Sequence, residues 1–181
     1  KPEKRHILID DGIVKAFLSE SEMLSIKRGH DTEVVDATGL VVAPGLIDMH
    51  VHLREPGEEY KETIQTGTQA AVAGGFTAVA CMPNTLPPND TSSITEFIAE
   101  RAEAAAHCRV YPIACITRRL KGEELTEFGL LKEAGAVAVS DDGRPVPDGK
   151  VMRRALECAK TLHLPVISHA EDLSLTRGGV M

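Results

Sequence analysis

The chain of 181 residues is poor in aromatic side chains, with no tryptophan, two tyrosines and four phenylalanines. Its hydrophobic content of 43% therefore comes mainly from small aliphatic residues, and together with 26% charged residues it is typical of a folded soluble domain and excludes a disordered tail. The sequence also lacks an apolar run of about 18 residues that could cross a bilayer, and its first residues lead into no signal-peptide core. We therefore expect a cytoplasmic protein without a membrane partner.

Basic clusters and paired cysteines are absent as well. The 27 acidic residues outnumber the 20 basic ones and give a formal charge of -7, which argues against a nucleic-acid partner. The four cysteines, Cys81, Cys108, Cys115 and Cys158, lie 27, 7 and 43 residues apart and form no CxxC pair. This spacing favours reduced thiols packed as small hydrophobic side chains over a zinc-thiolate site or a disulfide framework.

The first 45 residues contain short strand-like runs separated by turn residues. Asp10-Asp11-Gly12 is typical of a tight hairpin turn, and Pro44-Gly45 closes the region. The runs are residues 6–9, 13–18, 34–36 and 40–43. Residues 1–45 are therefore predicted to form part of a small β-sandwich-like subdomain.

From residue 46 onward, strand-like and helical patterns alternate. The strand-like runs begin 27 to 33 residues apart, which is the period of a βα unit, and cover residues 46–51, 76–82, 109–116, 136–140 and 165–168. Helical patterns lie between them, at residues 60–73, after the candidate caps Asp90 and Thr91, at residues 124–134, and from the cap Asp148 to Leu162. The fold class is therefore α/β, with a parallel sheet covered by helices.

Two architectures fit this pattern, a doubly wound sheet and a (β/α)8 barrel. A doubly wound nucleotide-binding sheet should carry a glycine-rich phosphate loop after its first strand, whereas the sequence there is the acidic His-Leu-Arg-Glu-Pro-Gly-Glu-Glu. The barrel is favoured. A barrel of this type has eight strands, so residues 46–181 are predicted to form about five of its eight βα units.

The first barrel strand ends in Asp48-Met49-His50-Val51-His52-Leu53-Arg54. Because alternate residues of a strand share a face, His50 and His52 should project together. Two imidazoles with this spacing can hold one divalent metal such as zinc. A parallel barrel carries its catalytic groups at the carboxyl ends of its strands, which favours a metal site at this position.

Three further strands end in polar residues that could reach the same rim. They are Met82-Pro83-Asn84-Thr85, Ser140-Asp141-Asp142-Gly143 and Ser168-His169-Ala170-Glu171-Asp172. Each segment alone could be a turn or a cap, but their occurrence at successive strand ends predicts a shared site. Strand alternation favours Asp142 over Asp141 as the inward-facing carboxylate, with Asp141 as the alternative.

In this order, the four motifs resemble those of the class I dihydroorotases in the amidohydrolase superfamily, and the resemblance runs almost from end to end of the chain. It implies a metal-dependent enzyme with one or two Zn²⁺ ions. His50 and His52 would bind the more buried metal, Asp142 would coordinate from the fourth strand, and His169 would bind the second metal position. The same resemblance implies that Arg54 and Asn84 hold the substrate carboxylate.

The implied reaction is the reversible cyclisation of N-carbamoyl-L-aspartate to dihydroorotate in pyrimidine synthesis. Related hydantoinases, dihydropyrimidinases and allantoinases use a carboxylated lysine at the fourth strand, but no lysine lies between Lys132 and Lys150. Arg54 also favours a substrate with a carboxylate. Another cyclic amidohydrolase, or a non-catalytic dihydroorotase-like partner of aspartate transcarbamoylase, remains an alternative.

The family resemblance also implies groups that these 181 residues do not include. The expected catalytic base, an aspartate after the eighth strand, and a histidine ligand after the sixth would both lie beyond Met181. We therefore expect a segment of a longer protein, with no catalytic base of its own and no activity in isolation. The expected partner is a small-molecule substrate, and association with further copies of the chain or with aspartate transcarbamoylase is left open.

Overall fold

The computed structural model describes residues 4–176 and 179. It divides into two compact units, residues 1–43 and 44–181, and each is described by itself. No helix within the described residues is both long enough and apolar enough to span a membrane.

The first unit is built on an antiparallel hairpin of β1 (His6–Asp10) and β2 (Ile13–Leu18), followed by the short helix α1 (Glu20–Ser25). Asp11 and Gly12 both have positive φ, as the predicted tight turn requires. The sequence pattern did not indicate α1, although Ser19 and Glu22 form a capping box at its start.

Two expected strands of this unit are not formed. Residues 34–36 and 40–43 are irregular, so their prediction as strands was wrong. A strand needs a neighbour to complete its backbone hydrogen bonds, and among residues 4–43 the sheet of the first unit contains β1 and β2 alone. Val41, for example, is 87% exposed. The apolar composition of these runs was therefore not sufficient to predict a strand.

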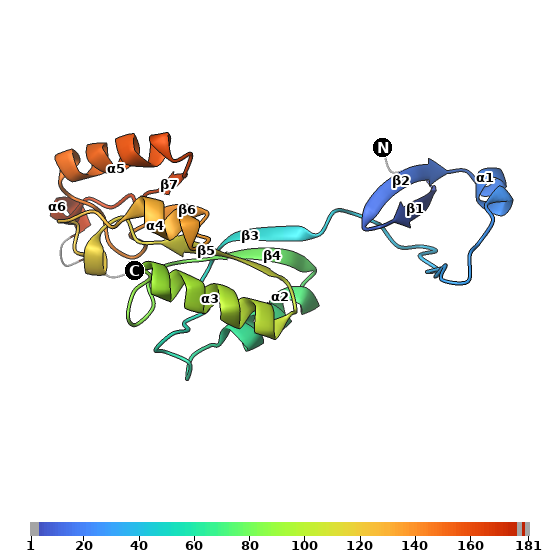
Figure 1. The fold of residues 1–181 in the computed structure, drawn as a ribbon, viewed down its shortest axis with the longest axis horizontal. Helices are drawn as coiled ribbons and strands as arrows, with labels where there is room; N and C mark the ends of the chain where they lie inside the picture. The colour runs from blue at the N-terminus through green and yellow to red at the C-terminus, as the bar shows by residue number, and fades with distance from the viewer. Residues whose placement is uncertain (1–3, 177–178, 180–181) are drawn as a thin grey trace. The chain divides into compact units, whose positions relative to one another are not determined.

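The second unit contains a five-stranded parallel sheet in the order β3-β4-β5-β6-β7 (Figure 1). Its strands are β3 (Leu46–Val51), β4 (Phe76–Cys81), β5 (Arg109–Ala114), β6 (Ala138–Ser140) and β7 (Val166–Ile167). Each strand pairs with the next one along the chain, as in a (β/α)8 barrel, whereas a doubly wound sheet reverses its order at a switch point. The predicted α/β class and partial barrel are confirmed.

Helices connect the successive strands. They are α2 (Ile64–Ala73), α3 (Ser92–Ala105), α4 (Phe128–Glu133) and α5 (Gly149–Thr161), with a 3-10 turn, η1 (Arg118–Leu120), after β5 and a last short helix, α6 (Leu173–Thr176). The core beneath them uses many small residues, which agrees with the composition. Its largest buried cluster contains Ala114, Ile116, Phe128, Leu131, Ala136, Val139, Ala155, Ala159 and Leu164.

Two helices begin later than the sequence pattern predicted. The first barrel helix begins at Ile64 instead of residue 60, because Thr63 caps it with its side chain. The helix expected from residue 124 begins at Phe128, because the preceding residues pair with the loop after β5. Leu125 forms an isolated β-bridge with Thr117. The helical periodicity of a sequence contains no information about long-range pairing of this kind.

Candidate metal centre

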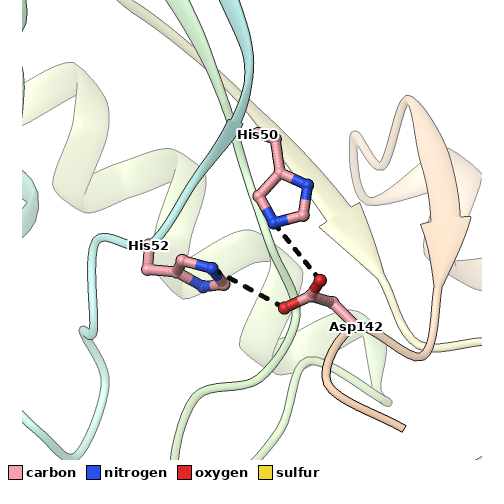
Figure 2. Close-up of side chains that lie close together, drawn as sticks. All are labelled: His50, His52 and Asp142. Atoms are coloured by element: carbon pink, nitrogen blue, oxygen red, sulfur yellow. Dashed lines mark ion pairs between the residues drawn. The ribbon is translucent and has the colours of Figure 1, made fainter. Parts of the chain in front are cut away.

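Three metal-ligating side chains meet at one end of the parallel sheet. His50 belongs to β3, His52 follows directly after it, and Asp142 follows β6. Figure 2 shows both imidazoles directed toward the carboxylate of Asp142. One ligand atom from each residue lies within 4.8 Å of the other two, and this is the one such group found in the described part of the chain. The structure therefore brings together three of the four ligands predicted from the sequence.

The distances within this group suit a shared cation. The Nε2 atom of His50 lies 3.2 Å from Asp142 Oδ1, and the Nε2 atom of His52 lies 3.7 Å from Asp142 Oδ2. Two ligand atoms on a tetrahedral zinc, each bonded at about 2.0–2.1 Å, stand about 3.3 Å apart. Two imidazoles and one carboxylate also form a donor set that zinc and related transition metals accept. The residues present can hold a metal ion.

Asn84, in the loop after β4, joins two members of the group. Its amide nitrogen donates to Asp142 Oδ2 at 2.9 Å, and its amide oxygen lies 2.9 Å from the Nδ1 atom of His52. Because this oxygen can only accept, Nδ1 is the donor in this contact. The contact therefore selects Nε2 as the ring nitrogen that is available to a metal. The sequence placed Asn84 at the site but gave no indication that it orients these two ligands.

The neighbouring carboxylates of Asp141 and Asp142 point to different surroundings. Asp141 is 1% exposed and accepts hydrogen bonds from the backbone N–H groups of Ile116 and Thr117, at 2.8 and 3.0 Å, and from the Thr117 hydroxyl. Burial raises the pKa of the Asp141 carboxyl, while these hydrogen bonds act in the opposite direction. Asp142, and not Asp141, lies beside the two histidines, as strand alternation indicated.

The fourth predicted ligand, His169, is not part of the group. Its Nε2 atom lies 3.1 Å from Oε2 of Glu171. Hydrogen bonds from the Thr176 hydroxyl and from His169 lower the pKa of the Glu171 carboxyl. A metal-binding role for His169 stays a prediction.

Arg54 follows the histidine pair, but its side chain lies beside Glu58 of the same loop. Its backbone has a φ of 59°, and its Nη1 atom lies 3.7 Å from Oε2 of Glu58. The ammonium group of Lys61 also contacts Glu58. A role of Arg54 in substrate binding stays a prediction.

The cysteines are free in the structure, as the spacing predicted. Cys81 and Cys115 are buried, whereas Cys108 and Cys158 are half-buried. Burial raises the pKa of the Cys81 thiol to about 12, and it raises the pKa values of Cys108 and Cys115 as well. These thiols behave as core side chains and none belongs to the candidate metal group.

Comparisons with known proteins agree on one family. A sequence model described as "Dihydro-orotase-like" matches residues 39–181. The "Dihydroorotase" of Syntrophobacter fumaroxidans is 58% identical over 175 residues, which cover 97% of this chain and 40% of that protein. The "Dihydroorotase" of Desulforapulum autotrophicum is 58% identical over 179 residues, covering 99% of this chain and 41% of that protein. The chain thus spans about two fifths of the length of these relatives.

A solved structure supports the fold independently of sequence. The "L-Hydantoinase (Dihydropyrimidinase) from Arthrobacter aurescens" superimposes with a TM-score of 0.75 over 93% of this chain and 37% of its own, at 21% sequence identity. At this identity the likeness establishes the fold alone.

Proposed function

The chain belongs to the dihydro-orotase-like family, and from this membership we propose that the full-length protein is a dihydroorotase that interconverts N-carbamoyl-L-aspartate and dihydroorotate in pyrimidine synthesis. The observation that carries the proposal is the group of His50, His52 and Asp142 at the carboxyl ends of the barrel strands. A (β/α)8 barrel holds its catalytic groups at this end. We expect the enzyme to be cytoplasmic.

The proposed cofactor is Zn²⁺, as one or two ions. His50, His52 and Asp142 would hold the first ion, and His169 would contribute to a second position. Bound zinc supplies Lewis acidity to the cyclic amide carbonyl and lowers the pKa of the attacking water. Asn84 keeps the Nε2 lone pair of His52 directed into the site through its contact with Nδ1.

The substrate carboxylate would be held by Arg54 and Asn84. A guanidinium binds a carboxylate through two parallel hydrogen bonds, which fixes the orientation of the substrate as well as its position. Orientation matters because two reacting groups that are held in the correct geometry react much faster than groups that meet by diffusion. The contact of Arg54 with Glu58 is long enough, at 3.7 Å, for the guanidinium to exchange it for a substrate carboxylate.

A group that accepts a proton from the attacking water is still required, and it must return that proton to the leaving nitrogen. We propose that this base is an aspartate supplied by the remainder of the barrel. The 181-residue chain by itself should then show no turnover of dihydroorotate, whereas the full-length protein should be active. Turnover by the isolated chain would contradict this assignment of the base.

The test of the proposed function is an assay of the purified full-length protein with a panel of cyclic amides, together with its metal content. We expect ring opening of dihydroorotate to exceed that of hydantoin and allantoin, and zinc to be bound. A preference for either neutral ring would instead identify another cyclic amidohydrolase. A protein without metal and without activity would favour a scaffold role beside aspartate transcarbamoylase, and the size of the purified assembly would reveal any homo-oligomer.

A further inference from the structure

The loop after β3 buries a carboxylate next to Arg54. Glu55 is only 4% exposed. Its Oε2 atom accepts a hydrogen bond from the backbone N–H of Ile64 at 2.8 Å, and its Oε1 atom accepts one from Nε of Arg101 at 2.7 Å. Ile64 is the first residue of α2, and Arg101 lies on α3. A single buried side chain therefore fastens this loop to two helices.

Arg54 itself lies in a backbone conformation that needs support. Its φ of 59° falls in the left-handed region, which residues with a side chain rarely adopt unless the surroundings hold them there. The turn is closed by the N–H of Glu55, which donates to the Leu53 carbonyl at 2.8 Å, and by the N–H of Glu58, which donates to the Arg54 carbonyl at 3.0 Å. Glu55 therefore closes this turn with its backbone N–H and anchors it with its side chain.

The same loop is also locked to the loop that carries Asn84. The N–H of Leu86 donates to the carbonyl of Pro56 at 3.0 Å. Gly57 packs so closely that a Cβ there would lie 1.9 Å from the Leu86 carbonyl oxygen. Arg54 and Asn84 therefore project from two loops whose backbones are fixed against each other.

We propose that Glu55, with Arg101 as its partner, is a positioning residue that holds the turn of Arg54 and thereby sets the affinity of the enzyme for the substrate carboxylate. This inference rests on the proposed function. A buried carboxylate that loses its partner must move toward water or toward another donor. Because Glu55 follows Arg54 directly, such a movement carries the guanidinium away from its bidentate geometry.

The test is a double-mutant cycle in the full-length enzyme, with Glu55→Gln and Arg54→Met made singly and together. Glu55→Gln should raise KM for dihydroorotate about 10- to 100-fold and change kcat by less than about threefold, since a small misplacement of a binding group has effects of this size. In the Arg54→Met background, Glu55→Gln should raise KM no further. Arg101→Met should reproduce the effect of Glu55→Gln, and Arg101→Lys should restore part of the loss.

Glu96→Gln is the matched control, because it removes an exposed carboxylate from the same helix as Arg101. It should leave KM and kcat at their wild-type values. The inference is overturned if Glu55→Gln leaves KM unchanged, or if its effect multiplies with that of Arg54→Met. If Glu55→Gln cannot be produced in folded form, Arg101→Met in the same cycle decides the question, since it leaves the bond between Glu55 and Ile64 in place.

A crystal structure of the Glu55→Gln or Arg101→Met protein provides a readout that does not depend on catalysis. We expect Arg54 to leave the left-handed region in that structure. A wild-type protein that does not convert dihydroorotate would refute the proposed function, and the structure would then decide this inference separately. An Arg54 turn that is unchanged in the variant would overturn it.

Discussion

Replacing Asn84 by alanine should weaken zinc binding about 10- to 100-fold, because side chains that orient metal ligands typically contribute this much. The structure gives the reason: the amide makes two hydrogen bonds of 2.9 Å, one to His52 and one to Asp142. A hydrogen bond contributes about 0.5–1.5 kcal/mol, and one to a charged group about 1.5–3 kcal/mol. Water can replace part of this in Asn84→Ala, since His52 is 30% exposed. The remaining loss of binding free energy is about 1.4–2.8 kcal/mol, which corresponds to the 10- to 100-fold weakening of zinc binding.

The measurement is a zinc titration of the full-length protein against a competing chromophoric chelator. Arg54→Met is the matched control, because the structure places its side chain near Glu58 and outside the metal group. It should bind zinc as wild type does and lose only affinity for the substrate. The reasoning would be refuted by an Asn84→Ala protein with wild-type zinc affinity and a raised KM alone, since Asn84 would then act on the substrate only.

Three further predictions concern the metal ligand, a close backbone contact and a buried thiol. Asp142→Ala should lower the zinc content of the purified protein and abolish its activity, as measured by elemental analysis and a dihydroorotate assay; full zinc occupancy would contradict the ligand assignment. Gly57→Ala should destabilise the protein by more than about 2 kcal/mol in urea unfolding, because the new Cβ would overlap the Leu86 carbonyl at a φ of 97°. The control is Gly75→Ala, which has a φ of 86° but open space around it and should lower the free energy of unfolding by only about 1 kcal/mol. Equal losses in the two variants would refute the steric argument. The pKa of the buried Cys81 thiol is raised from an ordinary 9.0 to about 12, so its contribution to stability is complete below about pH 9 and is lost as the pH rises toward 12. Because burial raises the pKa of Cys108 and Cys115 as well, the contribution of Cys81 is a difference between two proteins. The free energy of unfolding should fall with pH more steeply in the wild type than in Cys81→Ala, by about 1.4 kcal/mol per pH unit in this range, and identical slopes would disprove the shift.

The sequence predicted the second unit well because the relevant signals are local. The parallel strands are short apolar runs that recur with the period of a βα unit, and the first of them was predicted with its observed bounds, Leu46–Val51. His50 and His52 share a face because of strand alternation alone. Alternation along the fourth strand likewise favoured Asp142 over Asp141 as the inward-facing carboxylate.

What the sequence could not predict depends on contacts between distant segments. The double role of the Asn84 amide requires knowledge that His52 and Asp142 lie on either side of it. Glu55 looked like an ordinary charged loop residue, since nothing local indicates that Arg101, 46 positions away, would meet it in a buried setting. The prediction of strands at residues 34–36 and 40–43 was wrong for a related reason, because apolar composition does not supply a strand partner.

The metal group also depends on the bend of the sheet. In the sheet order β3-β4-β5-β6, the strand that carries His50 and the strand that precedes Asp142 are three spacings apart. In a flat sheet, where side chains stand roughly perpendicular to the plane, their ligand atoms would be about 14 Å apart. Their ligand atoms nevertheless lie within 4.8 Å of one another. An ion bound there contacts ligands that only the bend of the sheet brings together, so its affinity depends on the curvature of the whole sheet. A core substitution that flattens the sheet would therefore weaken metal binding without changing a ligand.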